Sequence, residues 1–154
     1  MQLQRSGESA VSQNDERHAF HGLNGTSPCM QALFKRLSDL AGRTDPVLIT
    51  GESGTGKTLA AKALHWAGCF RNEPLHSITA GHLLKENGSD SLSGCMDQAP
   101  GGTVCIDFIE RLLPGQQQML FRSLTALESA QSARLVAIAH GELAAAVADG
   151  RFRE

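Results

Sequence analysis

Residues 47–58 read VLITGESGTGKT, and this stretch decides the fold. It fits the P-loop pattern GxxxxGK[ST] and lies between an apolar run at 47–50, which predicts a strand, and residues 57–66, which favour a helix. The glycines let the backbone curl so that successive N–H groups point at phosphate oxygens, and the helix N-terminus adds its partial positive charge. The sequence therefore predicts a phosphate-binding loop between a strand and a helix.

Individual side chains of this loop have distinct expected roles. Lys57 is expected to reach the β and γ phosphates of ATP or ADP, and the Thr58 hydroxyl is expected to ligate Mg²⁺. The predicted nucleotide-binding residues are Gly51, Glu52, Ser53, Gly54, Thr55, Gly56, Lys57, Thr58 and Leu59.

A P-loop site also needs a second metal-binding group, normally an Asp at the end of a neighbouring apolar strand. Asp107 has this place, because it follows the apolar residues 104–106 and the small residues 101–103. We therefore predict Asp107 as the second Mg²⁺ ligand and as a member of the catalytic site.

The rest of the chain alternates between strand and helix patterns. Ser27 before Pro28 predicts the start of a helix whose apolar residues recur at helical spacing up to Ala41. Further strands are predicted at 75–79, 103–109 and 135–139, and further helices at 82–86, 113–128 and 142–148. We predict an α/β fold in which helices flank a mostly parallel sheet of about four strands, with residues 20–154 as its core. Residues 1–19 are predicted to be a flexible arm, and residues 87–102 a loop.

Length and composition restrict the class of protein. A chain of 154 residues predicts one domain, and 41% hydrophobic with 19% charged residues is typical of a soluble globular protein. We expect no membrane partner, because no apolar run is long enough for a bilayer helix, and a cytoplasmic location, because no signal peptide is recognisable. The net charge of −2 argues against a broad nucleic-acid surface, and the four cysteines lack the spacing of a metal site, so we expect free thiols.

Four stretches of the sequence resemble the AAA+ domain of sigma-54-dependent bacterial transcription activators. They are the segment GTSPCMQ at 25–31, the Walker A segment at 47–57, GGTVCID at 101–107, which is similar to the family's GGTLFLD Walker B segment, and GRFRE at 150–154. The resemblance implies a three-layer AAA+ P-loop NTPase that binds ATP or ADP with Mg²⁺ and acts in bacterial transcription regulation. It also implies that Arg153 is the arginine finger that reaches a neighbour's γ phosphate in a ring. The alternative for Arg153 is a frayed terminal residue.

The sequence departs from the family where ATP is hydrolysed. Phe108 stands where the family has the glutamate that polarises the attacking water, and a benzyl ring cannot accept a proton. Glu110 is an alternative acceptor, expected on the same face of the strand. Thr79 stands in place of the asparagine that holds this glutamate, and Ala139 and His140 in place of a Thr-Asn sensor pair. We therefore predict a nucleotide-binding domain with weak or absent hydrolysis.

The family resemblance also bears on assembly. Residues 78–97 leave no room for the family's GAFTGA loop, and the family's fifth strand, helical lid and helix-turn-helix are not found, so no direct DNA binding is expected. Without a fifth strand, residues 47–50 are expected to form an exposed sheet edge. This edge predicts self-association, assembly with an intact AAA+ activator, or cover by the N-terminal arm. The competing functional interpretation is a nucleotide-gated protein-interaction module outside transcription.

Overall fold

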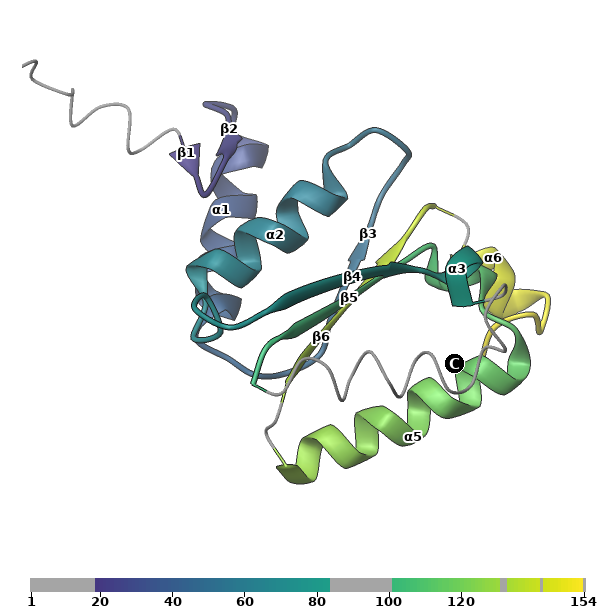
Figure 1. Ribbon diagram of the computed structural model, residues 1–154. Helices are drawn as coiled ribbons and strands as arrows, with labels where there is room; N and C mark the ends of the chain where they lie inside the picture. Colours follow the sequence, from purple (N-terminus) through teal and green to yellow (C-terminus); the bar gives the residue numbers. More distant parts are fainter. Residues whose placement is uncertain (1–18, 84–100, 131–132, 142, 154) are drawn as a thin grey trace, which may run out of the picture.

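A four-stranded parallel sheet forms the centre of the fold. The computed structural model describes residues 19–83, 101–130, 133–141 and 143–153. The sheet has the order β3-β6-β5-β4, and all of its pairings are parallel. Its strands are β3 (Val47–Thr50), β4 (Leu75–Thr79), β5 (Thr103–Asp107) and β6 (Arg134–Ala139) (Figure 1). The predicted α/β fold with a parallel sheet of four strands is confirmed.

Helices cover both faces of this sheet. Helices α1 (Pro28–Ala41) and α2 (Lys57–Ala67) pack on one face, and α5 (Pro114–Ala130) lies along the other (Figure 1). Strand β6 shows the reason, because Leu135 and Ala137 belong to the apolar cluster with α5, while Val136 and Ile138 belong to the cluster with α1 and α2. Residues of a strand alternate between faces, so a strand with apolar residues on both faces needs helices on both sides.

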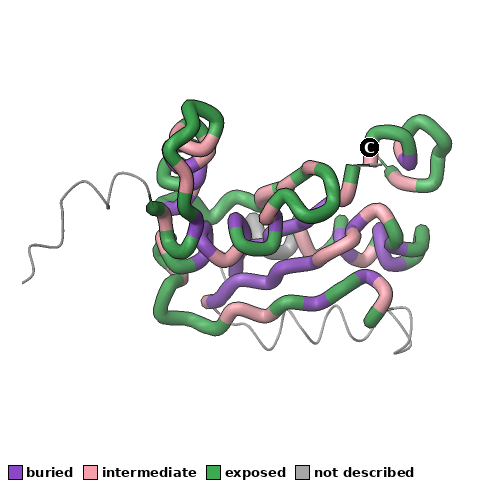
Figure 2. Tube along the Cα trace, turned by 90° about the horizontal axis from the view of Figure 1, so that it is seen from above, coloured by how far each residue is buried: buried purple, intermediate pink, exposed green. Residues whose placement is uncertain are grey.

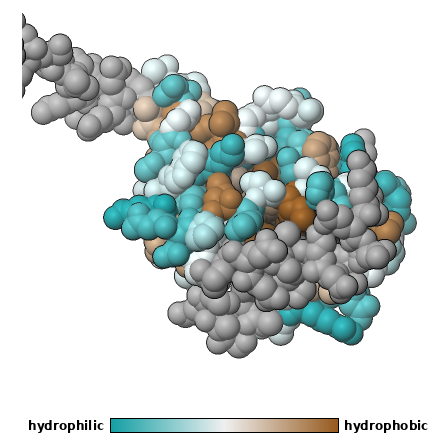
Figure 3. Space-filling view, in the orientation of Figure 1, coloured by the Kyte–Doolittle hydropathy of each residue, from teal (hydrophilic) through white to brown (hydrophobic). Residues whose placement is uncertain are grey.

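The burial of each strand depends on whether it lies at the centre or at an edge of the sheet. The central strands β5 and β6 are buried along almost their whole length, whereas β3 and β4 are partly exposed, and Figure 2 shows the buried segments at the middle of the molecule. On the face drawn in Figure 3, apolar residues form small separate patches among hydrophilic ones. In the part of the chain that the structure describes, none of the helices has the length and apolar character needed to cross a bilayer.

Helix α1 begins where the sequence predicts. The Ser27 hydroxyl accepts the backbone N–H of Met30 at 3.3 Å, and Pro28 occupies the first helical position. The short elements of the second half are α3 (Ala80–Leu83), the 3-10 helix η2 (Ile109–Arg111) and α6 (Leu143–Ala148). Helix α3 replaces the helical turns predicted at 82–86, of which residues 84–86 lie outside the described residues.

Strand β5 is shorter than predicted. It ends at Asp107 because Phe108 adopts a left-handed conformation with φ +59°, which breaks the extended backbone, and a 3-10 turn follows. The prediction that the strand continues to Ile109 is therefore wrong, and Glu110 does not lie on a strand.

A small antiparallel hairpin was not predicted. It pairs β1 (Ala19–Phe20) with β2 (Leu23–Asn24) around His21 and Gly22, both of which have positive φ. Ala19, predicted as the last residue of the arm, is thus part of a strand. The remainder of the predicted arm and most of the predicted loop at 87–102 lie outside the described residues.

Strand β3 forms an edge of the described sheet, as predicted. Only β6 pairs with it, and the Leu48 side chain is 51% exposed. A strand with one unpaired side presents backbone N–H and C=O groups that another strand can bind.

A buried histidine connects α2 to the sheet. The His65 side chain contacts the Thr103 hydroxyl, with 2.9 Å between Nδ1 and Oγ1. Burial, followed by the positive charge of Arg134, lowers the pKa of His65 below its usual value of 6.5. Arg134 is itself buried and donates to the Leu40 carbonyl at the end of α1, at 2.7 Å.

The lowered His65 pKa predicts a pH-dependent stability. The folded state binds fewer protons than the unfolded state at this site, so the free energy of unfolding should be highest above pH 6.5 and fall as the pH drops through that value. Urea unfolding between about pH 7.5 and about pH 5.5 measures this slope. The substitution His65→Gln should reduce it, and an equal slope in both proteins would contradict the prediction.

Candidate functional site

The predicted site residues meet at one edge of the sheet. The strands are in register, so that Thr50 of β3 lies beside Ala139 of β6, and Asp107 of β5 lies beside Thr79 of β4. The P-loop, Asp107 and His140 therefore all emerge at the carboxyl ends of the strands, where open α/β sheets bind ligands. Because β6 lies between β3 and β5, His140 leaves the sheet between the P-loop and Asp107.

The P-loop leads into α2 with free backbone donors. Gly54 and Gly56 have φ of +80° and +86°, a conformation that favours glycine. Gly56 is the N-cap of α2 and makes no side-chain capping bond, and the helical bonds begin with Ala60 N–H donating to the Gly56 carbonyl at 2.9 Å. The preceding N–H groups at the start of α2 are thus available to an anion.

The loop also holds its lysine in place. The Lys57 ammonium and the Thr55 hydroxyl both donate to the backbone carbonyl of Glu52. Lys57 is only 6% exposed, although Glu52, Ser53 and the following residues of the loop lie at the surface. A cation held beside free N–H groups is suited to a phosphate chain.

Asp107 and His140 form a hydrogen bond at the same edge of the sheet. The His140 Nε2 and the Asp107 Oδ1 atoms are 2.7 Å apart, and the Phe108 N–H donates to the same Oδ1 at 2.9 Å. The rings of His140 and Phe108 stack with centroids 4.0 Å apart and an interplanar angle of 9°, and the Arg111 guanidinium lies 4.6 Å from the Phe108 centroid. The His140 side chain, which follows β6, is thus in contact with the residues at the end of β5.

This stack offsets a strained backbone. A left-handed conformation at a residue such as Phe108 costs about 1–3 kcal/mol, and an aromatic pair contributes about 0.5–1.5 kcal/mol. The cation–π contact adds about 0.5–1 kcal/mol. These contacts therefore offset part of the cost of the Phe108 backbone conformation.

Of the two predicted Mg²⁺ ligands, Thr58 is exposed, whereas Asp107 is hydrogen-bonded through Oδ1. Thr58 lies exposed in the first turn of α2, where its hydroxyl suits a phosphate-bound cation. The two N–H donors to Asp107, however, match the two lone pairs of Oδ1. In the described parts of the chain, no three His, Cys, Asp or Glu side chains lie close enough together to hold a metal ion. The residues therefore do not fit a Mg²⁺ ion held by Asp107 Oδ1.

The remaining polar candidates have other partners. The Thr79 hydroxyl accepts the His82 N–H at 3.2 Å and so begins helix α3. Glu110 lies in the 3-10 turn, where its Oε2 accepts the backbone N–H of His140 at 3.4 Å. Sequence reasoning could not find the stack between Phe108 and His140, because the stack depends on the left-handed turn after Asp107.

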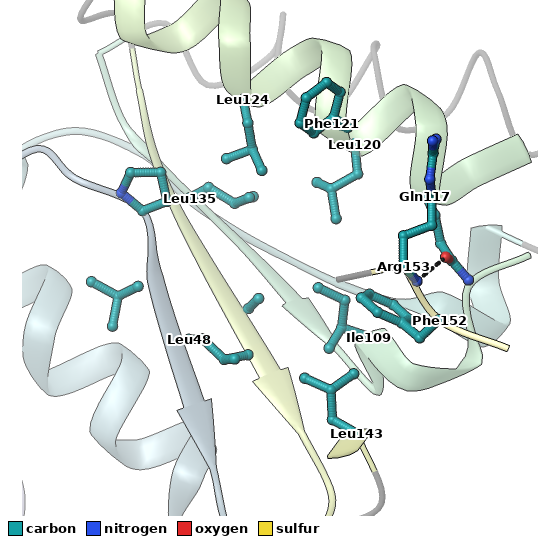
Figure 4. Close-up of a pocket in the computed structure, with 13 residues that line it drawn as sticks. Leu48, Ile109, Gln117, Leu120, Phe121, Leu124, Leu135, Leu143, Phe152 and Arg153 are labelled. Carbon is teal, nitrogen blue, oxygen red and sulfur yellow. Dashed lines mark hydrogen bonds between the residues drawn. The ribbon is translucent and has the colours of Figure 1, made fainter. Parts of the chain in front are cut away.

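Arg153, predicted as the finger, has a fixed backbone. Its N–H donates to Gln117 Oε1 at 3.0 Å (Figure 4). Gln117 Nε2 in turn donates to the carbonyls of Leu112 and Arg151 at 2.8 and 2.9 Å. Gln117 is 5% exposed, so these bonds are shielded from water. The Arg153 backbone is thus hydrogen-bonded to α5, whereas the residue as a whole is exposed.

The same residues border an apolar groove beside β3. The groove has a volume of about 370 Å³ and runs between α5 and the edge of the sheet (Figure 4). Leu48, Phe121 and Phe152 line it, and Phe121 is 66% exposed. The unpaired side of β3 is therefore continuous with an apolar surface.

Comparisons with known proteins agree on one family. The sequence model of the family described as "Sigma-54 interaction domain" matches residues 24–154. The DNA-binding transcriptional regulator NtrC of Azospirillum brasilense is 33% identical over 156 residues, which cover 86% of this chain and 32% of that protein. The chain thus spans about a third of the length of this relative.

Solved structures agree on the fold. NtrX from Brucella abortus, crystallised in complex with ATP, is 24% identical with a TM-score of 0.72, and the match covers 92% of this chain and 37% of that one. The P-loop NTPase domain of a sigma-54 activator from E. coli is 24% identical with a TM-score of 0.63, covering 81% of this chain and 84% of that one. These structures support the predicted P-loop NTPase fold.

Proposed function

The chain belongs to the family of sigma-54 interaction domains, and from this premise we propose that it binds ATP or ADP through its P-loop and hydrolyses ATP weakly or not at all. One observation carries the proposal: the buried Lys57 ammonium lies in the P-loop beside the uncapped N-terminus of α2. The complex of the similar NtrX with ATP supports the choice of nucleotide. Mg²⁺, expected from Thr58 and Asp107, is not part of this proposal, because Asp107 Oδ1 is engaged by His140.

The weak hydrolysis follows from the residues that surround Asp107. Phe108 cannot accept a proton, and its ring lies against His140. The Glu110 carboxylate faces the His140 backbone N–H and is displaced from the strand on which it was expected. Of the two residues proposed as catalytic, Asp107 is bonded within its own subunit, and Arg153 would act only on a nucleotide held by a neighbour.

The proposed role is in bacterial transcription regulation, as a domain that assembles with AAA+ subunits of its own family. Its relatives are transcriptional regulators, and the fixed backbone of Arg153 supports a contact between subunits. The second candidate is a nucleotide-gated interaction module outside transcription. The exposed edge of β3 and the apolar groove favour protein contact in either case.

Nucleotide binding should depend on Lys57. Replacing Lys57 with Ala should weaken binding of ADP about 10- to 100-fold, because a charged hydrogen bond contributes about 1.5–3 kcal/mol. Calorimetric titration measures the change. The control is Lys62→Ala, which removes a lysine from the same helix outside the loop and should leave the affinity unchanged. Equal affinities of wild type and Lys57→Ala would contradict the proposal.

Self-association should depend on the β3 edge. Sedimentation velocity at increasing concentration is expected to show species larger than the monomer, and Leu48→Lys should shift them to the monomer by placing a charge on the edge. The matched control is Leu113→Lys, since Leu113 is 55% exposed and lies outside the groove. A strict monomer at every wild-type concentration would count against self-association.

A further inference from the structure

One oxygen of the Asp107 carboxylate is engaged within the chain. Its Oδ1 accepts two hydrogen bonds, from the Phe108 N–H at 2.9 Å and from His140 Nε2 at 2.7 Å. An ionised carboxylate can only accept, so Nε2 carries the proton that lies between the two side chains. Two N–H donors therefore direct positive charge at the oxygen that a metal ion, or a water on it, would approach.

Contacts on several sides keep His140 in this place. Its ring stacks on Phe108, over which Arg111 lies, and its backbone N–H donates to Glu110. The side chain of His140 is only 18% exposed, and that of Asp107 only 21%. A cation that displaced His140 would break both the hydrogen bond and the stack.

Mg²⁺ has strict requirements for its coordination. It needs oxygen ligands in near-octahedral geometry, and it loses its bound waters reluctantly. Protein sites therefore bind it through carboxylate oxygens that have no other partner in the way. Here the imidazole Nε2 already lies 2.7 Å from the Asp107 Oδ1 atom. The proposed phosphate-binding elements are Lys57 and the start of α2, and neither takes part in the Asp107–His140 hydrogen bond.

We propose that this P-loop holds a nucleoside di- or triphosphate without a divalent cation, because the Asp107–His140 hydrogen bond engages Oδ1 of the carboxylate that would bind the metal. The inference rests on the proposed nucleotide binding and adds its cation requirement. His140 acts here as a positioning residue, since it acts through Asp107.

The affinity for a fluorescent, non-hydrolysable ATP analogue in excess Mg²⁺ and in EDTA tests this inference on the wild-type protein. The two dissociation constants should agree within about threefold, and a value tenfold or more tighter in Mg²⁺ would overturn the inference while leaving the proposed function intact. Absence of binding in both conditions would overturn the proposed function, and the inference with it.

The variant His140→Ala should create the cation requirement that the wild type lacks. Its binding should be at least about tenfold tighter in Mg²⁺ than in EDTA, since Asp107 is then open to the metal. The control His76→Ala removes an imidazole from β4 and should behave as the wild type. A variant that is as indifferent to Mg²⁺ as the wild type would overturn the role of His140.

A spectroscopic measurement separates this role from a structural one. In ¹⁵N NMR spectra of the nucleotide complex, the His140 ring signals, assigned from their absence in His140→Ala, should not move when Mg²⁺ is added. A shift of these signals that saturates with Mg²⁺ would show that the cation reaches Asp107, and it would overturn the inference.

Discussion

The parallel register of β3, β6 and β5 is the constraint on which the site depends. It brings the P-loop, His140 and Asp107 to the same edge of the sheet, with His140 emerging between the other two. The register is itself fixed by burial, because a one-residue slip of β6 would exchange the side chains that face α5 with those that face α1 and α2. The apolar core and the site are therefore not independent, since the packing of both faces determines which side chains meet at the edge.

The residues proposed to bind nucleotide and the positions linked to ATP hydrolysis lie in different segments of the chain. The elements proposed to bind phosphate belong to the loop between β3 and α2, and they comprise backbone N–H groups and the buried Lys57. The positions that the family resemblance assigns to water activation lie at the ends of β5 and β6, where Phe108 and His140 stack on each other and His140 contacts Asp107. A change in the second set can thus abolish turnover while the first set is kept. The proposed function is a domain that recognises nucleotide and contributes surfaces for assembly.

The sequence predicts the fold well, because the fold depends on local patterns. Apolar runs at strand length, the Ser27-Pro28 helix start and the glycines of the P-loop each act within a few residues. What it does not predict depends on contacts between distant residues or on an unusual backbone. The turn at Phe108 shortens β5, moves Glu110 away from the strand and brings a ring against His140, which lies 32 positions further along the chain. The bonds of Gln117 to Arg151 and Arg153 likewise connect two segments that no periodic pattern relates.

The central claim is that the site keeps a nucleotide without cleaving it. A single-turnover experiment tests it most directly, with γ-labelled ATP bound by an excess of the wild-type protein in the presence of Mg²⁺ and the release of labelled phosphate followed over time. The account predicts bound ATP that stays intact, with phosphate release no faster than from the same protein carrying Lys57→Ala. Release of phosphate from the wild type that is abolished by this substitution would contradict it.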